Sequence, residues 1–242
     1  EKYFGDIEGA SEVTRLEKMD SSLKGETDLR IFDNVHLPKY SLVWPSTSAF
    51  DKFEAPLDLL ATVLADGKSS RLYQSLVYEK QIAKEVSVYN YAREIAGEFS
   101  IEVIANSAES LLEIKDVVED ELFKIKDKYI LDEELQRAKN RVESLHLRQL
   151  EKMGGFGGRA DQLNYYNVMA GDPNLINEDL ERFSKVTVDD IRHAADQVLG
   201  PNRVRMEVVP ESKTLSVSTS IHRTVMPNSG PVSSFEPTIP ES

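Results

Sequence analysis

Residues 84–107 read KEVSVYNYAREIAGEFSIEVIANS, and the architecture is clearest in this stretch. Valine, isoleucine, tyrosine and phenylalanine alternate with polar residues on both sides of Ala96-Gly97. β-Branched and aromatic residues in such alternation are typical of half-buried strands. The stretch therefore predicts two β-strands, over 84–93 and 97–106, joined at Ala96-Gly97.

Two long helices are predicted directly after these strands. Residues 111–125 and 131–153 carry apolar side chains at spacings of three and four, which place them on one face of an α-helix. Upstream, residues 28–46 alternate like two further strands, and residues 50–67 predict an apolar helix that ends at Gly67.

The remaining predicted elements are short. A helix is expected over 69–80, and another over 159–170, which stops at Gly171. Two more fit 174–185 and 187–199, the latter with Thr187 as N-cap, and VRMEVVP at 204–210 reads as a final strand. Strands and helices come in blocks instead of βαβ alternation, which favours the α+β class over a doubly wound sheet.

The chain divides into three predicted parts. Residues 1–24 mix charge with glycine and serine without a sustained period, and we interpret them as a segment leading in from a preceding domain. Residues 25–210 form the predicted domain, and residues 211–242, rich in Ser, Thr and Pro, form an extended linker or tail. The chain opens without an initiator methionine, so we expect it to be a piece of a longer polypeptide.

Composition excludes several classes of function. A net charge of −13 argues against nucleic-acid binding, which normally needs a basic surface. The chain has no cysteine, so disulfide frameworks, thiol nucleophiles and cysteine-ligated metals are excluded. No apolar run is long enough to cross a bilayer, and we expect no membrane insertion.

A second stretch, GGFGGRADQLNYY at 154–166, invites three interpretations. It formally satisfies the dinucleotide pattern G-x-G-x-x-A, but that pattern must follow a strand, and here it follows a predicted helix. ADGKSS at 65–70 has an equally superficial similarity to a phosphate-binding loop, and we interpret it as the end of a helix followed by a turn. The stretch at 154–166 is then either a plain corner between helices or a hinge that presents Arg159 and a tyrosine to a substrate.

Arg159 and Tyr166 lie seven residues apart on the predicted helix. At about 100° per residue, their side chains project within about 20° of each other, two turns apart, whereas Tyr165 points elsewhere. A guanidinium and a phenol so placed could hold a peptide carbonyl or stabilise the oxyanion formed when water attacks it. The alternative is structural, with a surface arginine in a salt bridge and a tyrosine packed on the core.

Metal chemistry has no sequence support in this chain. The four histidines are scattered, and none pairs with another histidine or an acid at zinc-ligand spacing. We therefore predict that this chain binds no cofactor.

Several segments together resemble one peptidase family. They are EKYFGDI, PLDLLATVLADGKSSRLYQSLVYEKQIAKEVS, EELQRAKNRVE, RADQLNYYNVMAGDPN and VTVDDIRHAADQVLGPNRVRMEVVP, and they span the chain to about residue 210. They are similar to the second, non-zinc domain of pitrilysin-type zinc metallopeptidases, the inverzincins that include insulin-degrading enzymes and mitochondrial processing peptidases.

The resemblance implies a fold and a division of labour. The fold is a mixed, largely antiparallel sheet backed by helices. A zinc-bearing partner domain, in the same chain or a partner subunit, carries H-x-x-E-H and holds Zn, and the non-zinc domain closes over an extended peptide substrate. In such domains an arginine and a tyrosine seven apart, matching Arg159 and Tyr166, contact substrate and stabilise the tetrahedral intermediate.

This sequence also departs from the family in ways that leave two hypotheses open. It contains no H-x-x-E-H, so the chain alone should not hydrolyse peptides, although as part of a zinc metalloendopeptidase it would belong to an enzyme. The tail resembles the connector of tandem members, which leaves open which zinc site the pair faces. Alternatively, the chain is a catalytically inert scaffold or peptide-holding module of the same fold. Exported bacterial relatives favour the periplasm as its compartment.

Overall fold

The computed structural model describes residues 17, 23–128 and 130–211, all of which belong to one compact unit, Glu1–Glu211. The predicted leading segment, 1–24, lies mostly outside the described residues. The predicted tail lies outside them except for Glu211. Both predicted domain boundaries therefore stay predictions.

Five strands form one sheet in the order β1-β5-β2-β4-β3. Strand β1 pairs with β5 in parallel, and all other neighbours are antiparallel. This confirms the expected mixed, largely antiparallel sheet. The strands are β1 (Thr27–Asp33), β2 (Lys39–Ser46), β3 (Ala83–Ala92), β4 (Gly97–Ala105) and β5 (Val204–Pro210).

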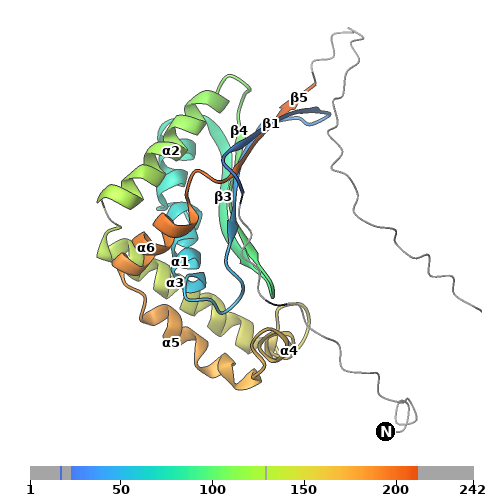
Figure 1. Cartoon of the computed structure of the whole chain (residues 1–242), viewed down its shortest axis with the longest axis vertical. Helices are drawn as coiled ribbons and strands as arrows, with labels where there is room; N and C mark the ends of the chain where they lie inside the picture. The colour runs from blue at the N-terminus through green and yellow to red at the C-terminus, as the bar shows by residue number, and fades with distance from the viewer. Residues whose placement is uncertain (1–16, 18–22, 129, 212–242) are drawn as a thin grey trace, which may run out of the picture. The chain divides into compact units, whose positions relative to one another are not determined.

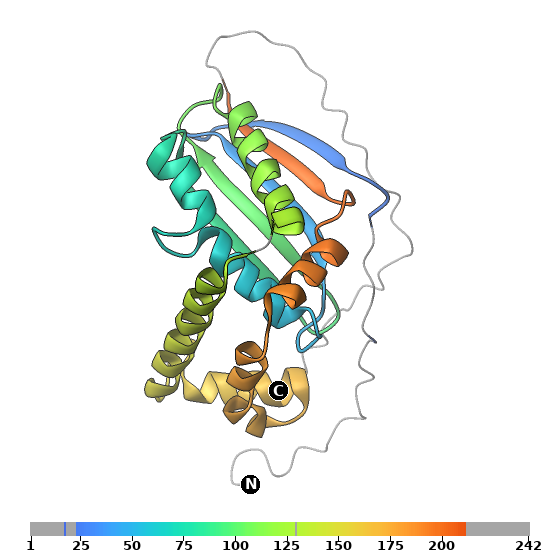
Figure 2. The same cartoon turned by 90° about the vertical axis from the view of Figure 1, so that its left-hand side faces the viewer.

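Helices cover one face of this sheet (Figures 1 and 2). They are α1 (Glu54–Ala65), α2 (Leu111–Lys128) and α6 (Val188–Val198), whereas α3 (Asp132–Glu151) packs against α1. Tyr40, Leu42 and Trp44 alternate along the central strand β2 and are each 0% exposed. Because successive side chains of a strand point to opposite faces, this alternation places the core between sheet and helices.

Two predicted helices differ from the structure. The helix predicted over 69–80 is wound as a π-helix, η1 (Tyr73–Glu79), and the backbone N–H of Lys80 donates to the carbonyl of Ser75 at 3.1 Å. The helix predicted over 174–185 is two pieces, a 3₁₀-helix η2 (Pro173–Asn177) and α5 (Asp179–Ser184). Apolar spacings of three and four fit all these windings, so the pattern could not distinguish them.

Two helix ends follow the sequence prediction. Helix α4 (Arg159–Ala170) stops at Gly171, whose φ of 78° is left-handed. Thr187 caps α6, since its hydroxyl accepts from the backbone N–H of Asp190 at 3.2 Å and Asp190 bonds back to the N–H of Thr187 at 2.8 Å. Within the described ranges, no helix combines the length and apolar character needed to cross a membrane.

Candidate functional site around helix α4

Arg159 is the first residue of α4, and its side chain is exposed. Its Nε and Nη2 donate to the backbone oxygen of Leu150, at 3.1 and 2.7 Å. That oxygen lies in the last turn of α3, where helix carbonyls lack an internal partner. The guanidinium thus ties the start of α4 to the end of α3, while its Nη1 makes no hydrogen bond within the described part of the chain.

Tyr166 is buried, with 2% of its surface exposed. Its hydroxyl donates to Oδ2 of Asp179 at 2.8 Å, and its ring centroid lies 5.7 Å from those of Phe50 and Tyr165. Burial and the Asp179 carboxylate hold the Tyr166 pKa well above its usual range, and burial raises the pKa of Tyr165 to about 12. Both phenols are therefore neutral hydrogen-bonding groups near pH 7.

Asp179 belongs to a partly buried ionic network that joins α5 to the start of α1. Arg182 donates from Nε to Oδ1 of Asp179 at 2.8 Å and from Nη1 to Oε2 of Glu54 at 2.7 Å, and its Nη2 lies 2.7 Å from the same Asp179 oxygen in an ion pair. The same Glu54 oxygen accepts the backbone N–H of Phe50 at 2.7 Å, and the Arg182 guanidinium lies 5.1 Å from the Phe50 ring centroid. Tyr166 is thereby held in a network that reaches back to residue 50.

Asp58 lies one turn beyond Glu54 on α1 and is half-buried. Burial raises its pKa to about 7, and the nearby Glu54 charge adds to this, although Asn90 opposes it by donating to Oδ1 of Asp58 at 3.0 Å. Asn90 in turn accepts the hydroxyl of Ser46 at 2.6 Å. A carboxyl that titrates near neutrality therefore lies between α1 and the sheet.

The structure places Arg159 and Tyr166 on one helix but in different surroundings. Among the residues it describes, no hydrogen bond or ion pair joins the two. Sequence reasoning missed Glu54, Asp58, Asp179 and Arg182. Glu54 and Asp58 could have been noticed in the sequence, because these two acids, four residues apart, interrupt the otherwise apolar EAPLDLLA. No sequence pattern singles out Asp179 and Arg182, since their partners lie far away in the chain.

Zinc, which the family resemblance implies, does not fit this chain's own residues. The sequence has no H-x-x-E-H, and no three His, Asp or Glu side chains of the described residues gather closely enough to hold a metal ion together. The ring of His193, for example, packs 5.4 Å from the Phe53 ring.

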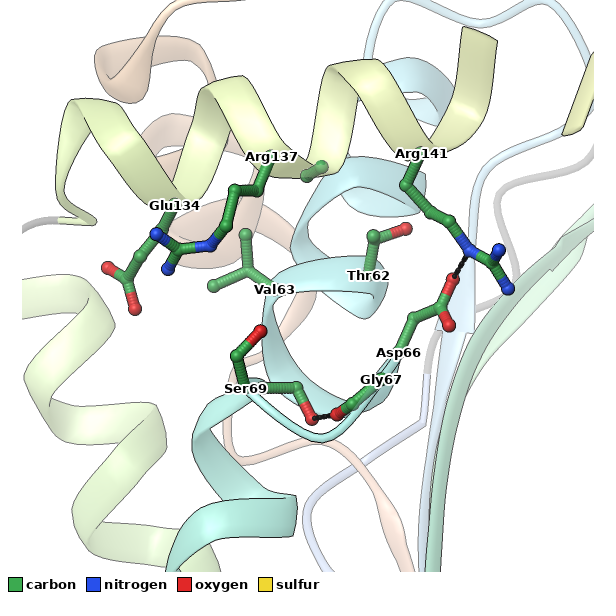
Figure 3. Close-up of a pocket in the computed structure, with 10 residues that line it drawn as sticks. Thr62, Val63, Asp66, Gly67, Ser69, Glu134, Arg137 and Arg141 are labelled. Atoms are coloured by element: carbon green, nitrogen blue, oxygen red, sulfur yellow. Dashed lines mark hydrogen bonds and ion pairs between the residues drawn. The ribbon is translucent and has the colours of Figure 1, made fainter. Parts of the chain in front are cut away.

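A pocket of about 350 Å³ lies between the end of α1 and α3 (Figure 3). Its charged groups are mostly paired, since Arg141 donates to Asp66 at 2.8 Å and Glu134 accepts from Arg71. Gly67 at its edge has a φ of 89°, and the chain turns there after α1. The loop at 65–70 is therefore the helix stop and turn that the sequence predicts.

The fold and a family match together define the class of this chain, the inactive domains of M16 peptidases. The chain belongs to the family described as the peptidase M16 inactive domain, which matches residues 1–142. It is also 27% identical over 157 residues to an uncharacterized zinc protease of Streptomyces coelicolor, covering 64% of this chain and 33% of that protein.

Solved structures share the fold. A protease from Helicobacter pylori superposes with a TM-score of 0.71 at 21% identity, covering 86% of this chain and 50% of that one. A peptidase M16 inactive domain from Pseudomonas fluorescens gives 0.64 at 18% identity, covering 85% and 48%. The chain thus spans a third of the curated relative and about half of these structures.

Proposed function

We propose that this chain is the non-zinc domain of a zinc metalloendopeptidase, closing over extended peptides together with a zinc-bearing domain. That domain lies in the same polypeptide or in a partner subunit. In this assembly, Arg159 and Tyr166 contact the peptide and stabilise the oxyanion that forms when water attacks it. Membership of the inactive-domain family supports the division between the two domains.

The observation that carries the role of Arg159 is its anchored but exposed guanidinium. Two of its nitrogens hold the Leu150 carbonyl, which limits the conformations of the side chain, while Nη1 has no partner within the described ranges. A preorganised donor loses less entropy on binding than a mobile one. It is therefore suited to hold a peptide carbonyl.

Tyr166 needs a movement before it can take part. Its hydroxyl is buried and bonded to Asp179, so the substrate reaches it only when the segments that carry Phe50 and Asp179 move away from it. We propose that peptide binding displaces these segments and exposes the hydroxyl, while Arg159 keeps its bonds to the Leu150 carbonyl.

The test compares variants of the complete peptidase, zinc domain included. Arg159→Ala should lower kcat/KM about 10²-fold, as loss of an oxyanion donor typically does. Tyr166→Phe should lower kcat by a similar factor. Arg148→Ala, an exposed arginine in the last turn of α3, is the matched control and should leave activity intact. Unchanged kcat/KM for both Arg159→Ala and Tyr166→Phe would remove the catalytic assignment.

An inert scaffold is the second candidate, and the burial of Tyr166 favours it. A phenol that is 2% exposed and bonded to an internal carboxylate has a sufficient structural role. In that case Tyr166→Phe lowers the free energy of unfolding by about 1–2 kcal/mol without changing the rate of peptide hydrolysis. Parallel measurement of activity and unfolding distinguishes the two functions.

A further inference from the structure

Phe156 lies in the middle of the loop between α3 and α4, flanked by two glycines on each side. It is 102% exposed, and no other large apolar residue that the structure describes is as exposed. Met153, three residues earlier, is 81% exposed. An aromatic side chain so exposed contributes nothing to the folding of the described domain.

Hydrogen bonds on both sides hold this loop in shape. The N–H of Arg159 donates to the carbonyl of Lys152 at 2.7 Å, and that of Gly158 donates to Gly155 at 3.1 Å. The N–H of Gly157, directly after Phe156, donates to Oδ2 of Asp161 at 2.9 Å. Phe156 is therefore held in solvent by a closed loop.

Its glycines are needed for this geometry. Gly155 and Gly157, the immediate neighbours of Phe156, have φ values of 83° and 75°, which other residues adopt only with strain. A Cβ on Gly158 would lie 2.8 Å from the carbonyl oxygen of Gly154, so this position also excludes a side chain. The backbone is thus specialised to project one aromatic residue.

Resting on the function proposed above, we propose that Phe156 is a specificity-determining residue that contacts a bulky apolar side chain of the peptide substrate. It precedes the exposed Arg159 by three residues, so one bound peptide can meet the guanidinium with its backbone and the ring with a side chain. Aromatic contact of this kind favours phenylalanine, leucine or tyrosine over alanine in the substrate.

The size of the contact favours a peptide over a permanently docked domain. A stable interface between domains or proteins buries about 800 Å² on each partner, whereas one phenylalanine buries about 150–250 Å². A single aromatic on a narrow loop supplies only a fraction of the larger area. It matches the side chain of an extended peptide.

The first experiment measures how fast the complete peptidase hydrolyses two peptides that differ only by leucine or alanine at one position. The position of this difference is moved along the peptide in successive pairs. Phe156→Ala should lower kcat/KM for the leucine peptide about tenfold, through KM, and leave the alanine peptide and the melting temperature unchanged. Phe123→Ala, a 62% exposed phenylalanine on α2, is the matched control and should change neither peptide. An equal loss for both peptides, separation of the two domains, or no loss would overturn the inference.

Two further measurements keep this inference separable from the proposed function. If Arg159→Ala lowers hydrolysis of both peptides while Phe156→Ala changes neither, only the role of Phe156 fails. If Arg159→Ala and Tyr166→Phe both leave hydrolysis unchanged, the catalytic part of the proposed function fails. Independently of turnover, Phe156→Trp in the complete peptidase adds an exposed indole to this part of the chain, whose one tryptophan, Trp44, is buried. Its emission should shift to the blue on titration with the leucine peptide and not with the alanine peptide; equal responses would contradict the assignment.

Discussion

Asp179→Ala should destabilise the domain by about 2–3 kcal/mol. The carboxylate accepts one hydrogen bond from Tyr166 and one from Arg182, whose Nη2 also forms an ion pair with it at 2.7 Å, and its side chain is 14% exposed. Removal of one partner of a buried ion pair costs about 3–5 kcal/mol. We reduce that figure because Arg182 is 31% exposed and keeps its bond to Glu54, which is 8% exposed.

Tyr166→Phe separates the hydroxyl from the rest of this network. It removes one hydrogen bond to a charged acceptor, worth about 1.5–3 kcal/mol, but Asp179 keeps Arg182. We expect a loss of about 1–2 kcal/mol. Since Asp179→Ala already leaves the hydroxyl without its partner, the double variant should cost about 1 kcal/mol less than the sum of the single variants.

Urea unfolding of the four proteins measures these free energies, with equal m-values as the check that each variant unfolds in the same way. Asp196→Ala, an exposed aspartate on α6, is the control and should stay within about 0.5 kcal/mol of the parent. A loss below 0.5 kcal/mol for Asp179→Ala, or strict additivity in the double variant, would refute the view that this network holds Tyr166.

Three further predictions follow from the fold. The pKa of Asp58 in the folded protein is raised to about 7, so its contribution to stability is complete below about pH 4 and is lost as the pH rises through 7. Asp58→Asn should therefore flatten this part of the pH–stability profile relative to the parent. Gly158→Ala should lower the melting temperature, because its Cβ meets the Gly154 carbonyl at 2.8 Å, whereas Gly154→Ala has open space and should not. Thr187→Ala should cost about 1 kcal/mol in urea unfolding by loss of the N-cap, and Thr187→Ser should restore most of it.

Local patterns were sufficient to predict most of the fold. Alternation located β3 and β4, and capping residues located the end of α4 at Gly171 and the start of α6 at Thr187. The pattern failed where winding is set by individual hydrogen bonds. Asp172, for example, accepts the N–H of Asn174 at 2.9 Å and starts a 3₁₀ turn instead of an α-helix.

The candidate site was less accessible to sequence reasoning. Both Arg159 and Tyr166 lie on α4, as the sequence predicts, but helical register cannot tell which part of a helix face is covered. Phe50 and Asp179, which lie on other segments, decide that Tyr166 is buried. The family resemblance singled out two residues on α4, whereas the network around them appears only in three dimensions.

The position of β5 in the sheet bears on how the chain folds during synthesis. Strand β5 is the last described strand to be made, yet it pairs on one side with β1 and on the other with β2. Thr27 is opposite Val204, so β1 has no partner in the described sheet until nearly the whole domain has left the ribosome.

We expect an early intermediate built on β2, β4 and β3 with their helices, and a late, slow step in which β5 inserts between β2 and β1, because contacts so distant in sequence form slowly. Premature termination before residue 204 would leave the sheet open at β2, with an unpaired edge prone to aggregation.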